Sequence, residues 1–245
     1  MGNPLSRSIF DDETARPTQS GWVQSLSTST SSINMTWLEE DGSIGVATKQ
    51  SSDAPGLENL VQAMGRGTLI ATETGTKAVE DLSPGDWIAQ DGAQPRRVLW
   101  IGSMYLEPKE TTDWPLTRIM AHSIDPNHPF PDLLLGRSAR VFRKGPQFPT
   151  FEGSAGVLVS AAKAYSSEQA FPIKPVAPVE MFHVLLDGHA IIKANGLPVE
   201  SFHPGPITQF GYDAKSLMRF MQCFPCFQRY QEFGSLAAPR QIEAF

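Results

Sequence analysis

Two stretches near residue 70 decide the fold: residues 67–72 read GTLIAT and residues 79–86 read VEDLSPGD. The first is a short apolar run with β-branched residues, which is typical of a strand. In the second, Pro84 presets φ and Gly85 permits a positive φ, so the chain can reverse tightly. We therefore predict a strand, a turn and a further strand over residues 87–89.

The pattern of short apolar runs separated by Gly and Pro continues to residue 194, without a sustained helical period. This spacing predicts an all-β protein. Pro-rich loops are expected at residues 125–131 and 148–153. The predicted strands cover residues 68–72, 76–79, 87–89, 97–101, 133–135, 140–142, 156–159, 182–185 and 190–194.

The two flanks have a different character. Residues 1–59 are rich in Ser, Thr, Asp and Gly and read as loop or weak strand, with a hairpin over residues 33–47 turning at Asp41-Gly42. Residues 213–233 carry apolar side chains at roughly helical spacing, although Pro225 would break or kink a helix. We expect a partly β extension and a helical tail packed on the β core.

Composition restricts the function classes. With 40% hydrophobic residues in 245, much of the chain can fold, while a net charge of -6 argues against a nucleic-acid partner. No apolar run is long enough to span a bilayer, and no Sec-type signal is seen, so no membrane partner and a cytoplasmic location are the default expectations. Cys223 and Cys226 cannot form a disulfide framework, and hydrophobic packing must hold the fold together.

The residues 67–86 resemble the opening of Hint domains, the hedgehog/intein self-processing family. Residues 132–141, DLLLGRSARV, resemble the family's central strand, and residues 182–202, FHVLLDGHAIIKANGLPVESF, resemble its closing segment. The three segments occur in family order and cover about residues 60–206, which leaves residues 1–59 as an extension and residues 207–245 as a tail. The resemblance implies a Hint-type horseshoe of short strands with pseudo-two-fold symmetry.

The resemblance also implies an acyl shift. In the family a Cys or Ser attacks the preceding peptide bond, a histidine protonates the departing nitrogen and polar groups hold the carbonyl. Counting back from the Gly-Thr pair places Ala63 at the nucleophile position. The Ser/Thr and His positions of the central strand fall on Gly136 and Ala139. A methyl group or a hydrogen cannot perform either step.

The closing segment also departs from the splicing members, because Glu200 and Ser201 stand where they carry His-Asn. The residual catalytic candidates are His189, which matches the histidine of the family's closing strand, together with His183, Ser201 and Thr68. For both histidines the alternative interpretation is a hydrogen-bonded side chain at a strand end. No cofactor or metal is implied.

Cys223 and Cys226 have the spacing of redox and zinc pairs. The surrounding pattern lacks the βαβ setting of a redox motif, and only His203 is near enough to add a zinc ligand. We expect reduced, packed cysteines.

Three functions remain open from the sequence. The first is a catalytically inactive Hint-fold protein acting as a structural or interaction module. The second is a self-cleaving protein with a non-standard nucleophile. The third is a binding module whose groove holds a peptide or its own N-terminal segment, residues 58–65. The alanines could be natural or engineered; because Met64, Gly65 and Gly136 also differ from the pattern, natural decay is the simpler account.

Overall fold

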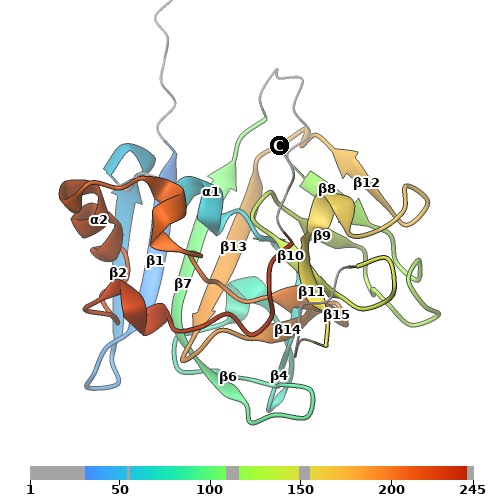
Figure 1. The fold of residues 1–245 in the computed structure, drawn as a ribbon, viewed down its shortest axis with the longest axis horizontal. Coiled ribbons are helices and arrows are strands. Elements are labelled where there is room, and N and C mark those ends of the chain that lie inside the picture. The colour runs from blue at the N-terminus through green and yellow to red at the C-terminus, as the bar shows by residue number, and fades with distance from the viewer. Residues whose placement is uncertain (1–30, 54–55, 109–115, 149–154, 242–245) are drawn as a thin grey trace, which may run out of the picture.

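The computed structural model describes residues 31–53, 56–108, 116–148 and 155–241, and these form an almost entirely β structure with a short C-terminal helix (Figure 1). This confirms the predicted fold class. The strands are β1 Ser32–Leu38, β2 Ile44–Gln50, β3 Met64–Gly65, β4 Leu69–Thr72, β5 Gly75–Ala78, β6 Trp87–Ile88, β7 Arg96–Leu106, β8 Leu116–Ile119, β9 Leu133–Leu135, β10 Arg140–Arg143, β11 Val157–Ser160, β12 Ala170–Ile173, β13 Val179–Leu186, β14 Ile191–Ala194 and β15 Leu197–Glu200. The α-helices are α1 Leu57–Val61 and α2 Ala214–Met221, and short 3-10 turns cover Ser51–Asp53, Val79–Asp81, Ala161–Lys163, Ile207–Phe210 and Tyr230–Phe233.

The strands pair antiparallel in a continuous path, β11-β10-β15-β14-β4-β6-β7-β13-β3-β9-β8-β12. Strand β7 is the long central member, and it joins the two halves of the path. Its first residues pair with β6, whereas the segment from Val98 to Leu106 pairs with β13. Figure 1 shows β7 and β13 side by side through the middle of the molecule.

The turns that the sequence predicted are present. Gly85 has φ 102°, and the Asp86 carboxylate accepts a hydrogen bond from the Ser83 amide at 2.8 Å, which closes the Pro-Gly turn. Asn195 and Gly196 both have positive φ and link β14 to β15 as a two-residue hairpin. The predicted hairpin at the N-terminal side is also confirmed, since β1 pairs with β2 over their whole lengths.

The hairpin does not stand apart from the rest of the sheet. Strand β1 pairs with β7 from Ile33↔Met104 to Trp37↔Trp100, so part of the N-terminal extension is built into the central sheet. This pairing does not test whether the extension folds by itself, and the domain boundaries stay predictions.

Two apolar clusters hold the fold together. One fills the space among the strands of the Hint-like region and includes Ala63, Val141, Ile192 and Val199. The second lies between the β1, β7 and β13 face and the tail, where Trp100 contacts Phe224 with ring centroids 4.8 Å apart. The tail thus covers apolar sheet surface, as the sequence predicted.

The helix of the tail is shorter than its apolar pattern suggested. α2 begins after the N-cap Asp213, whose carboxylate accepts from the Ser216 amide, and it ends at Met221, four residues before Pro225. Cys223 and Cys226 are free, and Cys223 is buried in the second cluster. No helix in the described part of the chain is long and apolar enough to cross a membrane.

Four strands escaped the sequence prediction, for identifiable reasons. β3 has only two residues, β8 contains Thr117 and Arg118, β12 contains Pro172 and β15 contains Pro198. A proline inside an apolar run normally argues against a strand, because it cannot donate to the ladder. Tertiary pairing overrides that local signal here.

The last described residues attach the tail to the strands. Leu158 of β11 donates its amide to Pro239 O at 2.8 Å and accepts from the Gln241 amide at 2.9 Å. Between these two residues, Arg240 Nε lies 2.8 Å from Glu200 Oε1, and Glu200 is only 1% exposed. This strand-like contact therefore places the Arg240 guanidinium against the buried Glu200 carboxylate.

Replacing Arg240 by Ala should lower the free energy of unfolding by about 3 kcal/mol, because a buried carboxylate loses a partner. Urea denaturation followed by circular dichroism measures the change. The matched control is Arg229→Ala in the same tail, whose pair with Glu232 is exposed and should contribute less than about 1 kcal/mol. Equal effects of the two substitutions would contradict the role given to Arg240.

Candidate functional site

The position that corresponds to the family nucleophile lies directly after helix α1. Helix α1 ends at Val61 and Gln62 is its C-cap. Ala63 follows with 0% exposure, and its amide donates to Val61 O at 2.8 Å. Met64 then pairs with Phe182 of β13 and with Leu135 of β9. The Gln62–Ala63 peptide is therefore held inside the protein by strands on both sides.

The segment after β9 clamps this peptide through its backbone. The Ser138 amide donates to Gln62 O at 3.1 Å, and the Gly136 amide donates to Ala63 O at 2.8 Å. Ala139 follows, buried in the same apolar cluster as Ala63. The structure thus brings together the three positions where the sequence lacks the family's reactive groups.

The clamp depends on glycine at position 136. A Cβ atom added there would lie 2.3 Å from Gln62 O and 2.9 Å from the Met181 methyl carbon. The first of these is a backbone atom that cannot move aside easily. The space that a Ser or Thr side chain would need has therefore been closed by the backbone.

His183 lies on the opposite wall, in β13. Its Nδ1 atom donates to Leu60 O at 2.5 Å, and its Nε2 atom is buried with no hydrogen-bond partner among the described residues. Burial lowers the pKa of His183 to about 4, despite the opposing effect of the Leu60 hydrogen bond. The ring is therefore neutral near pH 7, and its free nitrogen can accept a proton but has none to donate.

A buried ionic network lies near His183. The Glu200 carboxylate lies 2.8 Å from Arg240 Nε, 3.4 Å from Arg140 Nη1 and 3.1 Å from His189 Nε2. Burial alone would raise the pKa of Glu200, but His189 and the two arginines outweigh it and lower the pKa to about 2. Glu200 therefore stays ionised inside the protein.

His189 is fixed from both sides of its ring. Nδ1 accepts a hydrogen bond from the Ala237 amide at 2.7 Å, which places the ring proton on Nε2, facing Glu200. The N–H is not aligned with the carboxylate oxygen, so the contact is electrostatic rather than a well-formed hydrogen bond. His203 packs edge-on against this ring, with centroids 5.1 Å apart. Burial lowers the pKa of His203 to about 4.

The hydroxyl candidates are both engaged in local structure. Thr68 Oγ1 donates to Gly65 O at 2.6 Å, and Ser201 Oγ accepts from the Ala190 amide at 3.0 Å. Ser201 is completely buried. Both hydroxyls bond groups other than the Gln62–Ala63 peptide, and their catalytic role stays a prediction, as does that of the two histidines.

Sequence reasoning missed the residues that fill the site. Glu200 was noted only as a replacement, and Arg240 gave no signal, because an arginine near the end of a polar tail reads as a solvated charge. Ser138 was also overlooked. Its hydroxyl is buried without a partner among the described residues, two positions from Gly136.

Substituting Gly136 by Ala should lower the free energy of unfolding by about 2–3 kcal/mol, because the new methyl group meets the Gln62 carbonyl. The matched control is Ser138→Ala, which removes an unpaired buried hydroxyl and should change stability by less than about 0.5 kcal/mol. Urea titrations measure the free energy of unfolding of both variants. Unchanged stability of Gly136→Ala would show that the clamp has room.

The protein should lose stability as the pH falls from 6.5 to 4. His183 keeps a pKa of about 4 when folded, whereas the unfolded chain takes up the proton near 6.5, so acid favours unfolding over this range. The loss is on the order of 3 kcal/mol for this histidine. Glu200, with its pKa near 2, adds a further loss below pH 4.5.

Denaturation curves at several pH values measure this dependence. His183→Asn can keep a donor for Leu60 O and should make the slope between pH 6.5 and 4 shallower. Part of the slope should remain, because burial also lowers the pKa of His203 to about 4. The control His122→Asn changes an exposed histidine with φ 60°, a conformation that asparagine tolerates, and should leave the slope as it is. A wild-type slope in the His183 variant would contradict the assignment.

Comparison with known proteins places this site in a family. Residues 63–206, more than half of the chain, match the Hint domain. Two crystal structures of the MchDnaB-1 intein are similar at 14% sequence identity and a TM-score of 0.32. The matches cover 58% and 57% of this chain and 100% and 99% of the inteins. No curated protein matches. The likeness to the inteins is distant, and the domain match carries the assignment: this chain belongs to the Hint domain family.

Proposed function

We propose that this chain is a Hint-fold protein that does not cleave itself and that serves as a structural or interaction module. One observation carries the proposal. In the Gln62–Ala63 peptide, which we call the junction peptide, the residue at the nucleophile position is a buried alanine, and the backbone of residues 136–138 binds both carbonyls. Self-processing needs an attacking atom at this point. Ala63 offers only a methyl group.

The family's proton donor is missing as well. Ala139 stands where the family has its histidine, and His183 is neutral with a free acceptor nitrogen. Of the family's three kinds of catalytic group, only a carbonyl-binding donor is present. The Ser138 amide donates to Gln62 O, and backbone amides of this kind stabilise a developing oxyanion. A polarised carbonyl without a nucleophile and an acid does not react.

One observation favours a second candidate, an active protein with a non-standard nucleophile. The buried Ser138 hydroxyl has no partner among the described residues, and its own amide binds the Gln62 carbonyl. Attack by Ser138 Oγ would form an ester with Gln62, break the Gln62–Ala63 bond and pass the hydroxyl proton to the Ala63 nitrogen. The clamp offers no base for this step, so we rank it second.

Intact-mass measurement separates the two candidates. The purified full chain is incubated from pH 6 to 9 with dithiothreitol or neutral hydroxylamine, which open thioesters and esters. We expect one species at 26.8 kDa. Fragments 1–62 and 63–245 would overturn the proposal, and their disappearance in Ser138→Ala would establish the second candidate.

The same spectra test the other hydroxyls. Breaks before Thr68 or Ser201, abolished in Thr68→Ala or Ser201→Ala, would equally show activity. Cleavage between Asn195 and Gly196 is set aside, because hydroxylamine attacks Asn-Gly bonds directly.

A further inference from the structure

A fork in the sheet opens a second site, apart from the closed junction peptide. Strand β5 pairs with all four residues of β4 and so occupies one of its two edges. β14 pairs with β4 at Ile70 and β6 pairs with it at Thr72, so both must share the other edge. Beyond these single pairs the two strands diverge.

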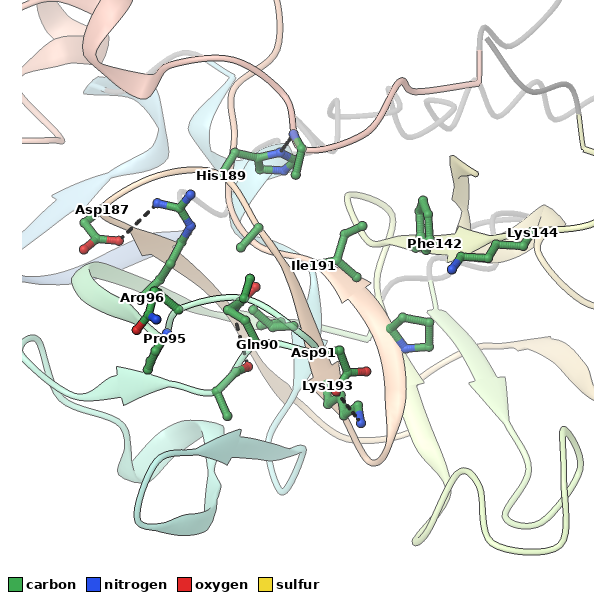
Figure 2. A pocket seen from close by; sticks show the side chains of 17 residues that line it. Gln90, Asp91, Pro95, Arg96, Phe142, Lys144, Asp187, His189, Ile191 and Lys193 are labelled. Carbon is green, nitrogen blue, oxygen red and sulfur yellow. Dashed lines mark hydrogen bonds and ion pairs between the residues drawn. The ribbon is translucent and has the colours of Figure 1, made fainter. Parts of the chain in front are cut away.

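A cavity of about 630 Å³ lies in this fork. One wall is formed by β14, and the other by residues 89–96, which follow β6. Phe142 and Lys144 lie across the cavity from Asp187 and Arg96, and His189 lies at its edge (Figure 2). The cavity therefore borders the ionic network without being part of it.

The β14 wall presents a free strand edge. β15 pairs with β14 along its length on one side, and β4 reaches it on the other side only at Ala194. Within the described residues, no strand pairs with Ile191 on the side of the cavity, the side toward which its N–H and C=O groups point. An unpaired edge of this kind offers main-chain donors and acceptors to an added strand.

The charges at the fork indicate which side chains would suit it. Arg96, Lys144 and Lys193 oppose Asp91 and Asp187, a balance of three minus two, or +1, in a chain whose net charge is -6. Lys193 lies 2.8 Å from Asp91 and Arg96 lies 3.5 Å from Asp187. Because all four side chains are substantially exposed, these pairs are weak and a ligand carboxylate can compete for the cations.

We propose that the fork binds an extended peptide that adds as a strand to the β14 edge. Acidic side chains of the peptide face Lys193, Lys144 and Arg96, and apolar side chains lie against Phe142 and Pro198. The inference gives the proposed interaction module its binding surface. It rests on that module role, yet it is tested by binding and not by cleavage, so the two can fail separately.

The probe is a fluorescein-labelled peptide with the sequence Thr-Asp-Val-Asp-Val-Thr, which places its carboxylates on one face of a strand and its valines on the other. Fluorescence anisotropy at low salt follows its binding to the full chain. We expect saturable binding that weakens about tenfold or more in the Lys144→Glu/Lys193→Glu variant. The control Lys215→Glu, on helix α2, should bind as the wild type does.

Replacing the two aspartates of the peptide by asparagine should also weaken binding about tenfold. If the acidic peptide does not bind, the proposal is overturned. It is also overturned if the double variant binds the peptide as tightly as the wild type does. Circular dichroism establishes that the double variant is folded; if it is not, Lys144→Gln and Lys193→Gln, each tested alone, take its place and should each weaken binding measurably.

Strand addition has its own test, because a strand turns alternate N–H groups toward opposite edges. One peptide is N-methylated on both aspartates and another on both valines. We expect one of them to lose binding about tenfold and the other to keep it, with amide NMR shifts at Ile191 and Lys193, which share the parity that faces away from β15. Equal affinities of the two peptides, or shifts confined to other regions, overturn the strand geometry.

Discussion

The buried carboxylate of Glu200 is the constraint on which the rest of the molecule depends. An ionised group at 1% exposure is tolerated only when polar and charged partners surround it, and here the partners come from three separate places. Arg140 begins β10, His189 lies between β13 and β14, and Arg240 comes from the tail. The network therefore fixes the relative positions of segments that are distant in the sequence; Arg140 and Arg240 are 100 residues apart.

The same core contains Ala63 and Ala139, the positions that correspond to the family's nucleophile and histidine. The Gln62 and Ala63 carbonyls accept hydrogen bonds from the Ser138 and Gly136 amides, and Gly136 allows an approach that no side chain permits. His183 binds Leu60 O on the opposite side. These hydrogen bonds hold the peptide within the core, which supports the proposal of a non-cleaving module.

The fork beside this core has the opposite character. It is open, lined by partly exposed ion pairs, and bounded by an unpaired strand edge, whereas the Gln62–Ala63 peptide is buried and both of its residues have hydrogen-bonded carbonyls. His189 touches both regions, through Glu200 on one side and the cavity on the other. A ligand in the fork would therefore lie close to the network that anchors the tail.

The sequence by itself determined the all-β class, the Pro84-Gly85 and Asn195-Gly196 turns, and the absence of reactive groups at Ala63 and Ala139. These are local properties, because turn geometry and side-chain chemistry belong to single residues. Only the tertiary structure decided that Gly136 closes on Gln62 O, that Arg240 returns to Glu200, and that β14 and β6 diverge from one edge of β4. Each of these is a contact between segments distant in the chain, and residue spacing along the sequence carries no information about such contacts.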